Sequence, residues 1–330
     1  MESMGEACLI FAPAASRALG DRIASSLGDS LAALEEREFE DGEHKARPLC
    51  SVRGADTFVV HSLYGDGRQS ANDKLVRLLF LVGALKDAGA ARATAVVPYL
   101  AYARKDRKSK LRDPVSTRYA AQLFEAVGTD RIVALDVHNL AAYQNAFRCC
   151  AEHLEAAPLF VRELMPVVGD EPLTVVSPDS GGIKRADEFR RRLCAATGRT
   201  VAFGFAEKHR SGGVVSGDGF AGDVDGRTVI IVDDLISTGT TMARVAAACR
   251  ARGARRVYAV ATHGLFAAAA NSTLREDAFD RIFVTDSVPP IRVTDAALAA
   301  KIAQVGVAPL LAEAISRLHG QGSLVNLAEG

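Results

Sequence analysis

The stretch that decides the fold is Val229-Ile-Ile-Val-Asp-Asp-Leu-Ile-Ser-Thr-Gly-Thr-Thr241. It opens with a continuous apolar run, which predicts a strand covered on both faces of a parallel sheet. Two adjacent carboxylates, Asp233 and Asp234, end that run. A loop of small residues follows, and we expect a helix to begin around Met242. At the carboxyl end of a parallel strand, such a loop faces a ligand crevice.

The loop itself is rich in groups that bind phosphate. Its hydroxyls and backbone N–H groups come from Ser237, Thr238, Gly239, Thr240 and Thr241. Together with a helix N-terminus they suit a phosphate dianion. The two aspartates would repel such an anion, so we expect them to accept hydrogen bonds from sugar hydroxyls or to act through Mg²⁺. The chain has no G-x-x-x-x-G-K-[ST] pattern, so this is not a Walker A loop. A polar strand-to-helix turn with capping hydroxyls is the structural alternative.

Apolar runs rich in Val and Ile alternate with stretches of helical periodicity. The predicted strands are Thr57–His61, Ala93–Pro98, Arg131–Asp136, Leu173–Ser177, Thr228–Val232 and Arg256–Ala261. The predicted helices are Asn72–Asp87, Pro114–Val127, Ile183–Ala196 and Thr241–Arg252. This alternation predicts an α/β fold with mostly parallel sheets, built from right-handed βαβ units and flanked by helices.

The two halves of the chain resemble each other. Residues Lys86–Tyr99 run parallel to Arg250–His263, with Gly89 over Gly253, where each preceding helix is expected to end in a left-handed cap. We interpret this as a duplicated α/β domain; the alternative is the general likeness of any two βαβ units. The predicted domains are residues 1–157 and 158–305, followed by a C-terminal helix and tail, 306–330, that packs on one of the two halves.

Composition excludes several classes of protein. The 330 residues contain 40 Lys plus Arg and 40 Asp plus Glu, so bulk electrostatics does not favour a nucleic-acid or anionic-membrane partner. No apolar run reaches the roughly 18–20 residues that span a bilayer. The segment Met1–Leu9 has no basic residues, so it does not read as a signal peptide. Six cysteines without C-x-x-C spacing indicate reduced thiols, and we expect a cytoplasmic protein.

Further segments make the resemblance to a family specific. The phosphate loop resembles the phosphoribosyl-pyrophosphate signature of type I phosphoribosyltransferases. The other segments are Phe39–Glu43, Val97–Lys108, Asp136–His138, Ser177–Gly182 and Val284–Asp286. In this order they resemble the ribose-phosphate diphosphokinases. The resemblance implies two duplicated type I phosphoribosyltransferase-like domains. It also implies Mg²⁺-dependent transfer of a diphosphoryl group from ATP to the C1 hydroxyl of ribose 5-phosphate.

The predicted catalytic residues are Lys208 and Arg210. They lie in Glu207-Lys-His-Arg210, just before a glycine-rich stretch, where a cationic cluster suits an arm that closes over the transferring group. By resemblance these two residues match the family's catalytic Lys and Arg. Composition alone would favour a solvated charged face.

The resemblance also implies how ATP is bound. Arg104, Lys105, Asp106 and Arg107 follow a predicted strand, and their cations suit the phosphates. Phe39, Asp41 and Glu43 lie around a short turn, where a ring can stack on adenine and carboxylates can accept from its amine. In the family this turn reaches the nucleotide of a neighbouring subunit. The resemblance therefore implies a homo-oligomer whose active site lies at a subunit interface.

The resemblance implies His138 and Asp179 as Mg²⁺ ligands, with His138 also close to ATP. Few protein ligands are expected, because Mg²⁺ keeps water and phosphate oxygens. In the phosphate loop, Ser237 stands where family members commonly carry Asp. Two other functions stay open: a non-catalytic regulatory paralogue of the synthetase, and a phosphoribosyltransferase that consumes phosphoribosyl pyrophosphate.

Overall fold

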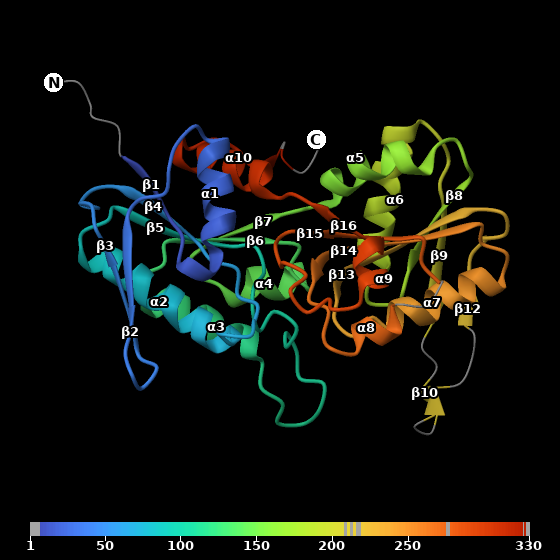
Figure 1. Ribbon diagram of the computed structural model, residues 1–330, viewed down its shortest axis with the longest axis horizontal. Helices are drawn as coiled ribbons and strands as arrows, with labels where there is room; N and C mark the ends of the chain where they lie inside the picture. The colour runs from blue at the N-terminus through green and yellow to red at the C-terminus, as the bar shows by residue number, and fades with distance from the viewer. Residues whose placement is uncertain are drawn as a thin grey trace. The chain divides into compact units, whose positions relative to one another are not determined.

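The computed structural model describes residues 7–207, 210–211, 214–215, 219–274, 278–325 and 327, with backbone only between 207 and 218. The chain divides into two compact units (Figure 1). Unit 1 consists of Met1–Glu155 together with Ala308–Gly330, and unit 2 of Ala156–Val307.

Unit 1 is built on a five-stranded parallel sheet of order β1-β4-β5-β6-β7. Its strands are β1 (Cys8–Phe11), β4 (Asp56–Val60), β5 (Arg92–Val97), β6 (Arg131–Leu135) and β7 (Cys150–Leu154). Its helices are η1 (Ala14–Ser16), α1 (Arg17–Ser26), α2 (Ala71–Asp87), α3 (Ser116–Ala126), α4 (Leu140–Ala146) and α10 (Ala308–His319). Every residue of β4 is buried, as expected for a strand covered on both faces.

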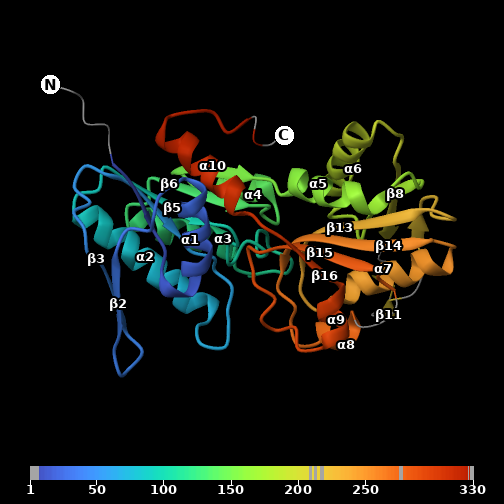
Figure 2. The same cartoon turned by 45° about the horizontal axis from the view of Figure 1, so that its top comes forward.

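An antiparallel hairpin is attached to unit 1. It consists of β2 (Leu34–Glu38) and β3 (His44–Pro48), with Glu38 opposite His44. The sequence prediction missed this hairpin, because its residues are mostly charged and give no apolar run. β3 packs against α2, and the turn between the strands extends beyond the helices of unit 1 (Figures 1 and 2).

Unit 2 contains a seven-stranded sheet of order β12-β9-β8-β13-β14-β15-β16, in which only β12 is antiparallel to its neighbour. Its strands are β8 (Leu173–Ser177), β9 (Ala202–Glu207), β12 (Gly219–Ala221), β13 (Thr228–Ile236), β14 (Arg256–Gly264), β15 (Arg281–Thr285) and β16 (Ile302–Val305). Its helices are α5 (Ala157–Val168), α6 (Ile183–Thr197), α7 (Thr240–Ala251), α8 (Ala270–Thr273) and α9 (Ala296–Lys301). Between β9 and β12, β10 (Arg210–Ser211) and β11 (Val214–Val215) form a short separate ladder.

The repeated hydrogen bonds of the two units support duplication. Gly89 and Gly253, which follow α2 and α7, have φ of 89° and 86°, the expected left-handed conformation. The Gly54 N–H donates to the Gly89 carbonyl at 2.8 Å, and the Gly226 N–H donates to the Gly253 carbonyl at 2.9 Å.

An aspartate also occupies equivalent positions in the two units. Asp130 accepts from the Ala93 N–H and from Lys86. Asp280 accepts from the Val257 N–H and from Arg250 in the same way. Each carboxylate ties the start of a strand to the helix before it. Local contacts this specific go beyond the general likeness of two βαβ units.

The predicted elements correspond to observed ones with shifts at their ends. The strands are β4, β5, β6, β8, β13 and β14, and the helices are α2, α3, α6 and α7. The largest difference is in β13, which does not end before the carboxylates but continues through Asp233 and Asp234 to Ile236. It does so because β14 continues beside it and pairs with it as far as Gly264.

Within the described residues, no helix is long and apolar enough to cross a membrane.

Candidate active site

The acid pair lies in the last part of β13, at the carboxyl edge of the sheet of unit 2. The Asp234 side chain is almost fully buried, whereas 24% of the Asp233 side chain is exposed. The backbone N–H of Asp234 donates to Asp233 Oδ1 at 2.9 Å. The end of β13 therefore carries one covered and one partly exposed carboxylate.

The loop after β13 leads directly into α7, which begins at Thr240 and not at Met242. Gly239 is the N-cap, has φ of 77°, and offers no side chain to cap the first turn. A Cβ at this position would lie 2.6 Å from the Leu274 side chain. Glycine is thus required by both conformation and space. No side-chain oxygen caps α7, which leaves the first-turn N–H groups suited to an anion.

The hydroxyls of the loop lie on the accessible side. Thr238 and Thr240 are exposed, and their hydroxyl oxygens lie 3.1 Å apart. The Ser237 carbonyl accepts from the Ala267 N–H, which anchors the start of the loop. Two of the five predicted phosphate-binding residues therefore present their hydroxyls close together at the start of α7.

Arg185, in the first turn of α6, contacts both carboxylates. Its Nη1 donates to Asp234 Oδ1 at 3.2 Å and lies 3.6 Å from Asp233 Oδ1. Burial and the neighbouring Asp234 raise the pKa of Asp233 to about 8, and Arg185 opposes that rise. The sequence prediction missed Arg185. Nothing in the sequence indicates that β8, which leads into α6, pairs with β13.

The segment after β8, the strand that pairs with β13, forms a compact turn. Asp179 Oδ1 accepts from the N–H groups of Gly181 and Gly182, at 3.0 and 3.2 Å. The Ser177 hydroxyl donates to the Asp179 carbonyl. One carboxylate oxygen of Asp179 is therefore engaged within the turn. Its other oxygen is the one available to a ligand.

The predicted catalytic arm falls largely outside the described residues. Lys208 and His209 are not described. Arg210 begins β10, but its side chain is not described. The surrounding backbone shows that the arm leaves the sheet along β9 and returns along β12, because Glu207 pairs with Gly219.

In unit 1, two of the segments predicted to bind ATP lie together. Asp106 Oδ2 accepts from the Asn139 amide at 2.7 Å, which brings residues 104–107 beside His138. Lys105 pairs with Asp113 at 2.7 Å, so its ammonium is held by its own loop. Arg104, Arg107 and His138 are exposed.

The third predicted ATP segment is the turn of the hairpin. The Phe39 N–H donates to the Glu43 carbonyl at 2.8 Å, and Asp41 Oδ1 accepts from the Glu43 N–H. The Arg37 guanidinium lies 4.8 Å from the centre of the Phe39 ring, a cation–π contact. Asp41 and Glu43 are exposed at the end of the hairpin. The turn is therefore preformed, with its ring supported and its carboxylates accessible.

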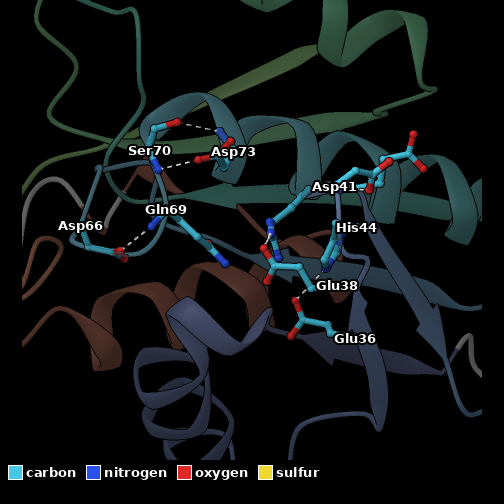
Figure 3. Close-up of polar contacts among 10 residues, drawn as sticks. Glu36, Glu38, Asp41, His44, Asp66, Gln69, Ser70 and Asp73 are labelled. Carbon is cyan, nitrogen blue, oxygen red and sulfur yellow. Dashed lines mark hydrogen bonds and ion pairs between the residues drawn. The ribbon is translucent and has the colours of Figure 1, made fainter.

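Close to its turn, the hairpin is held to α2 by an ion pair and is braced internally by a contact between His44 and Glu36 (Figure 3). Arg77 of α2 donates to Glu38 Oε1 at 2.9 Å, and His44 Nε2 lies 3.3 Å from Glu36 Oε1. The Arg77 side chain is 9% exposed. The Arg77–Glu38 pair connects the hairpin to α2, and the His44–Glu36 contact joins its two strands.

The loop that precedes α2 is held by a buried lysine. Lys74 is fully buried, pairs with Asp66 at 2.8 Å and lies 3.6 Å from the centre of the Tyr64 ring. Asp66 Oδ1 also accepts from the Arg68 and Gln69 N–H groups, and Ser70 caps α2 in a capping box with Asp73 (Figure 3). Burial would raise the pKa of Asp66, but Lys74 and the backbone donors hold it below its usual value.

Comparison with known proteins covers nearly the whole chain. Residues 8–128 match the N-terminal domain of ribose phosphate pyrophosphokinase, and residues 218–328 match the phosphoribosyl synthetase-associated domain. The ribose-phosphate pyrophosphokinase of Caldanaerobacter subterraneus subsp. tengcongensis is 37% identical over 302 residues, 91% of either chain. The chain belongs to the ribose-phosphate pyrophosphokinase family.

Other members of this family agree in length and fold. The ribose-phosphate pyrophosphokinase of Hyphomonas neptunium is 36% identical, over 95% of this chain and 97% of the relative. The crystal structure of phosphoribosylpyrophosphate synthetase from Mycobacterium smegmatis superimposes with a TM-score of 0.85 at 34% identity, covering 96% of this chain and all of the other. This match confirms the predicted fold class and the prediction of an enzyme.

The donor set for a metal is sparse. Within the described residues, no three His, Cys, Asp or Glu side chains form a group that could hold an ion. Of the two predicted ligands, His138 is exposed and Asp179 keeps one oxygen for a ligand. Each of these side chains offers one donor, and Mg²⁺ takes most of its oxygens from phosphate and water.

Proposed function

We propose that the chain is a Mg²⁺-dependent ribose-phosphate diphosphokinase. It transfers the β,γ-diphosphoryl group of ATP to the C1 hydroxyl of ribose 5-phosphate and yields phosphoribosyl pyrophosphate and AMP. The observation that carries this proposal is the acid pair of β13 directly ahead of the uncapped start of α7. The family membership over nearly the whole chain supports it.

The loop of unit 2 binds the sugar phosphate. Residues 237–241 donate hydroxyls and first-turn N–H groups to the 5-phosphate. Asp233 and Asp234 accept hydrogen bonds from the ribose hydroxyls, which orients the sugar without repelling the phosphate. Ser237 donates to the phosphate where family members commonly carry a carboxylate.

The groups of unit 1 bind the nucleotide. Phe39 stacks on adenine, and Asp41 and Glu43 accept from its amine. The cations Arg104, Lys105 and Arg107 bind phosphate oxygens, while Asp106 holds this segment to Asn139 beside His138. Lys208 and Arg210 stabilise the charge that develops on the transferring diphosphoryl group, which is where a cationic arm lowers the barrier.

His138 and Asp179 are the residues that would hold Mg²⁺. The ion supplies charge neutralisation on the phosphate oxygens. The chain itself binds and orients both substrates and excludes water through the arm.

We further propose that the active site is shared between subunits of a homo-oligomer. The turn 39–43 extends beyond the helices of its own unit (Figure 2), and the family resemblance supports its reaching a neighbour's nucleotide. The test mixes two inactive variants, Phe39→Ala and Lys208→Ala. Activity regained on mixing would support the shared site, and its absence after subunit exchange would contradict it.

The proposed reaction is tested by measuring AMP formed from ATP and ribose 5-phosphate across a range of Mg²⁺ concentrations. Turnover well above that of Lys208→Ala is expected. No turnover, together with co-purification of an active synthetase, would favour a regulatory paralogue. Base-dependent release of pyrophosphate from phosphoribosyl pyrophosphate would favour a phosphoribosyltransferase.

A further inference from the structure

We propose that Arg185 is a positioning residue for the acid pair. Its guanidinium is the counter-charge that favours the ionised form of Asp233 and Asp234, the form in which they accept hydrogen bonds from the sugar hydroxyls of ribose 5-phosphate. This inference rests on the proposed function and adds a residue that the sequence motifs do not contain.

Arg185 belongs to a helix, and its guanidinium lies within reach of both acids. It lies in the first turn of α6, which packs against β13. One nitrogen, Nη1, lies 3.2 Å from Asp234 Oδ1 and 3.6 Å from Asp233 Oδ1. Its side chain is 26% exposed, so the guanidinium lies at the same partly covered edge as Asp233. A single atom in reach of both carboxylates couples their ionisation.

The surroundings explain why a counter-charge is needed. Adjacent carboxylates on one strand repel each other, and burial disfavours the charged form of each. On the far side of β13, β14 offers Ala261 opposite Asp233 and His263 opposite Leu235. The α7 side begins with Thr240 and Thr241. Arg185 is a cation that the structure places within reach of both acids.

The consequence is a defined dependence of sugar binding on pH. A carboxylate accepts from two hydroxyls, whereas a protonated carboxyl offers fewer acceptors. The pKa of Asp233 is raised to about 8 even with Arg185 in place. Binding of the sugar should therefore strengthen as pH rises through this value. Without the guanidinium, the same rise should occur at a higher pH.

The experiment measures the dissociation constant of ribose 5-phosphate by calorimetry between pH 7 and 9.5, with Mg²⁺ and a non-hydrolysable ATP analogue present. The 5-phosphate is a dianion throughout this range, because the second pKa of a phosphate monoester is about 6. Four proteins are compared: wild type, Arg185→Gln, Arg185→Lys and the matched control Arg191→Gln. Arg191 lies on the same helix and pairs with Asp187 and Glu188, away from the acid pair.

We expect Arg185→Gln to bind about tenfold more weakly at pH 7.5 and to approach wild type at pH 9.5. Arg185→Lys keeps the charge and should keep the wild-type midpoint, and Arg191→Gln should behave as wild type. Equal midpoints in wild type and Arg185→Gln, or a loss that is the same at every pH, would overturn the proposal.

Two further outcomes are informative. If circular dichroism shows that Arg185→Gln does not fold, Arg185→Lys decides: a midpoint shifted upward would mean that charge is not what Arg185 contributes. If wild type itself does not bind ribose 5-phosphate, the proposed function fails, and the counter-charge role fails with it.

Discussion

Asp234 keeps 4% of its side chain exposed and Asp233 keeps 24%, although the two residues are adjacent on one strand. Both carboxylates nevertheless lie near one guanidinium, because Arg185 Nη1 is 3.2 Å from Asp234 Oδ1 and 3.6 Å from Asp233 Oδ1. Asp233 is the more exposed of the two acids. The sequence predicts both acids and the loop after them. It does not predict Arg185, because that contact depends on which strands are neighbours.

At this scale, Asp234→Asn is expected to raise the KM for ribose 5-phosphate. A hydrogen bond to a charged group contributes about 1.5–3 kcal/mol, which corresponds to about 10- to 100-fold. The KM for ATP should change much less. Steady-state kinetics with each substrate varied in turn measures both, and Asp223→Asn is the control, because Asp223 pairs with Arg227 at the surface. An unchanged KM for the sugar would contradict the role of Asp234.

His61 is expected to make unit 1 sensitive to acid. It is fully buried and bonded to Ser16, and burial followed by the Lys74 charge lowers its pKa to about 3, against 6.5 when unfolded. Between these values the unfolded state binds the extra proton, so stability is retained above pH 6.5 and lost as pH falls below it. The loss from this group approaches about 1.4 kcal/mol per pH unit.

The measurement is the denaturant midpoint at pH 7.5 and at pH 5.0, for wild type and His61→Gln. The variant should start from a lower midpoint and lose less of it on acidification. Parallel losses in the two proteins would show that His61 is not the group responsible.

Among the elements, the hairpin β2–β3 is one that could not be predicted from the pattern of apolar residues. Strands such as β4 and β8 could be predicted because apolar runs mark them in the sequence. In the structure all their residues are buried. Most residues of Leu34–Glu38 are charged, and burial alternates only along β3. The hairpin is stabilised by the packing of β3 on α2 and by the Arg77–Glu38 pair, which propensity alone does not indicate.

Arg77→Met should loosen this hairpin and raise the KM for ATP several-fold, with little effect on the KM for ribose 5-phosphate. Methionine keeps the buried stem of the side chain but cannot hold Glu38. The control is Arg47→Met, which removes an ion pair with Glu35 on the opposite face. If Arg47→Met raised the KM for ATP as much as Arg77→Met, the anchoring role of Arg77 would be refuted.

At the scale of the whole molecule, unit 1 is discontinuous. The chain completes β7, forms all of unit 2 and then returns as α10. This helix packs against α1 (Figures 1 and 2). His319 bonds to the buried Asp56 at 3.1 Å, and Arg92 pairs with the same carboxylate. The sequence predicted the helix and left open which half it joins, because its apolar face fits either.

Truncation after Val307 is expected to unfold unit 1. It removes Leu311, Ile315 and Leu318, each almost fully buried. At about 1.5–3 kcal/mol for each side chain, the loss is comparable with the whole stability of a domain. Limited proteolysis should then cut residues 1–155 and spare 156–307. Truncation after Gly322 keeps α10 and serves as control. Equal protection of both units in the shorter chain would contradict this prediction.

The return of α10 has a consequence for synthesis. A ribosome releases the first segments of unit 1 early but adds α10 only after all of unit 2 has been synthesised. Unit 2 therefore has its full complement of strands while unit 1 is still waiting for a partner to cover α1. During translation, unit 1 therefore stays without α10 until the whole of unit 2 has been made, whereas the sheet of unit 2 needs no later segment.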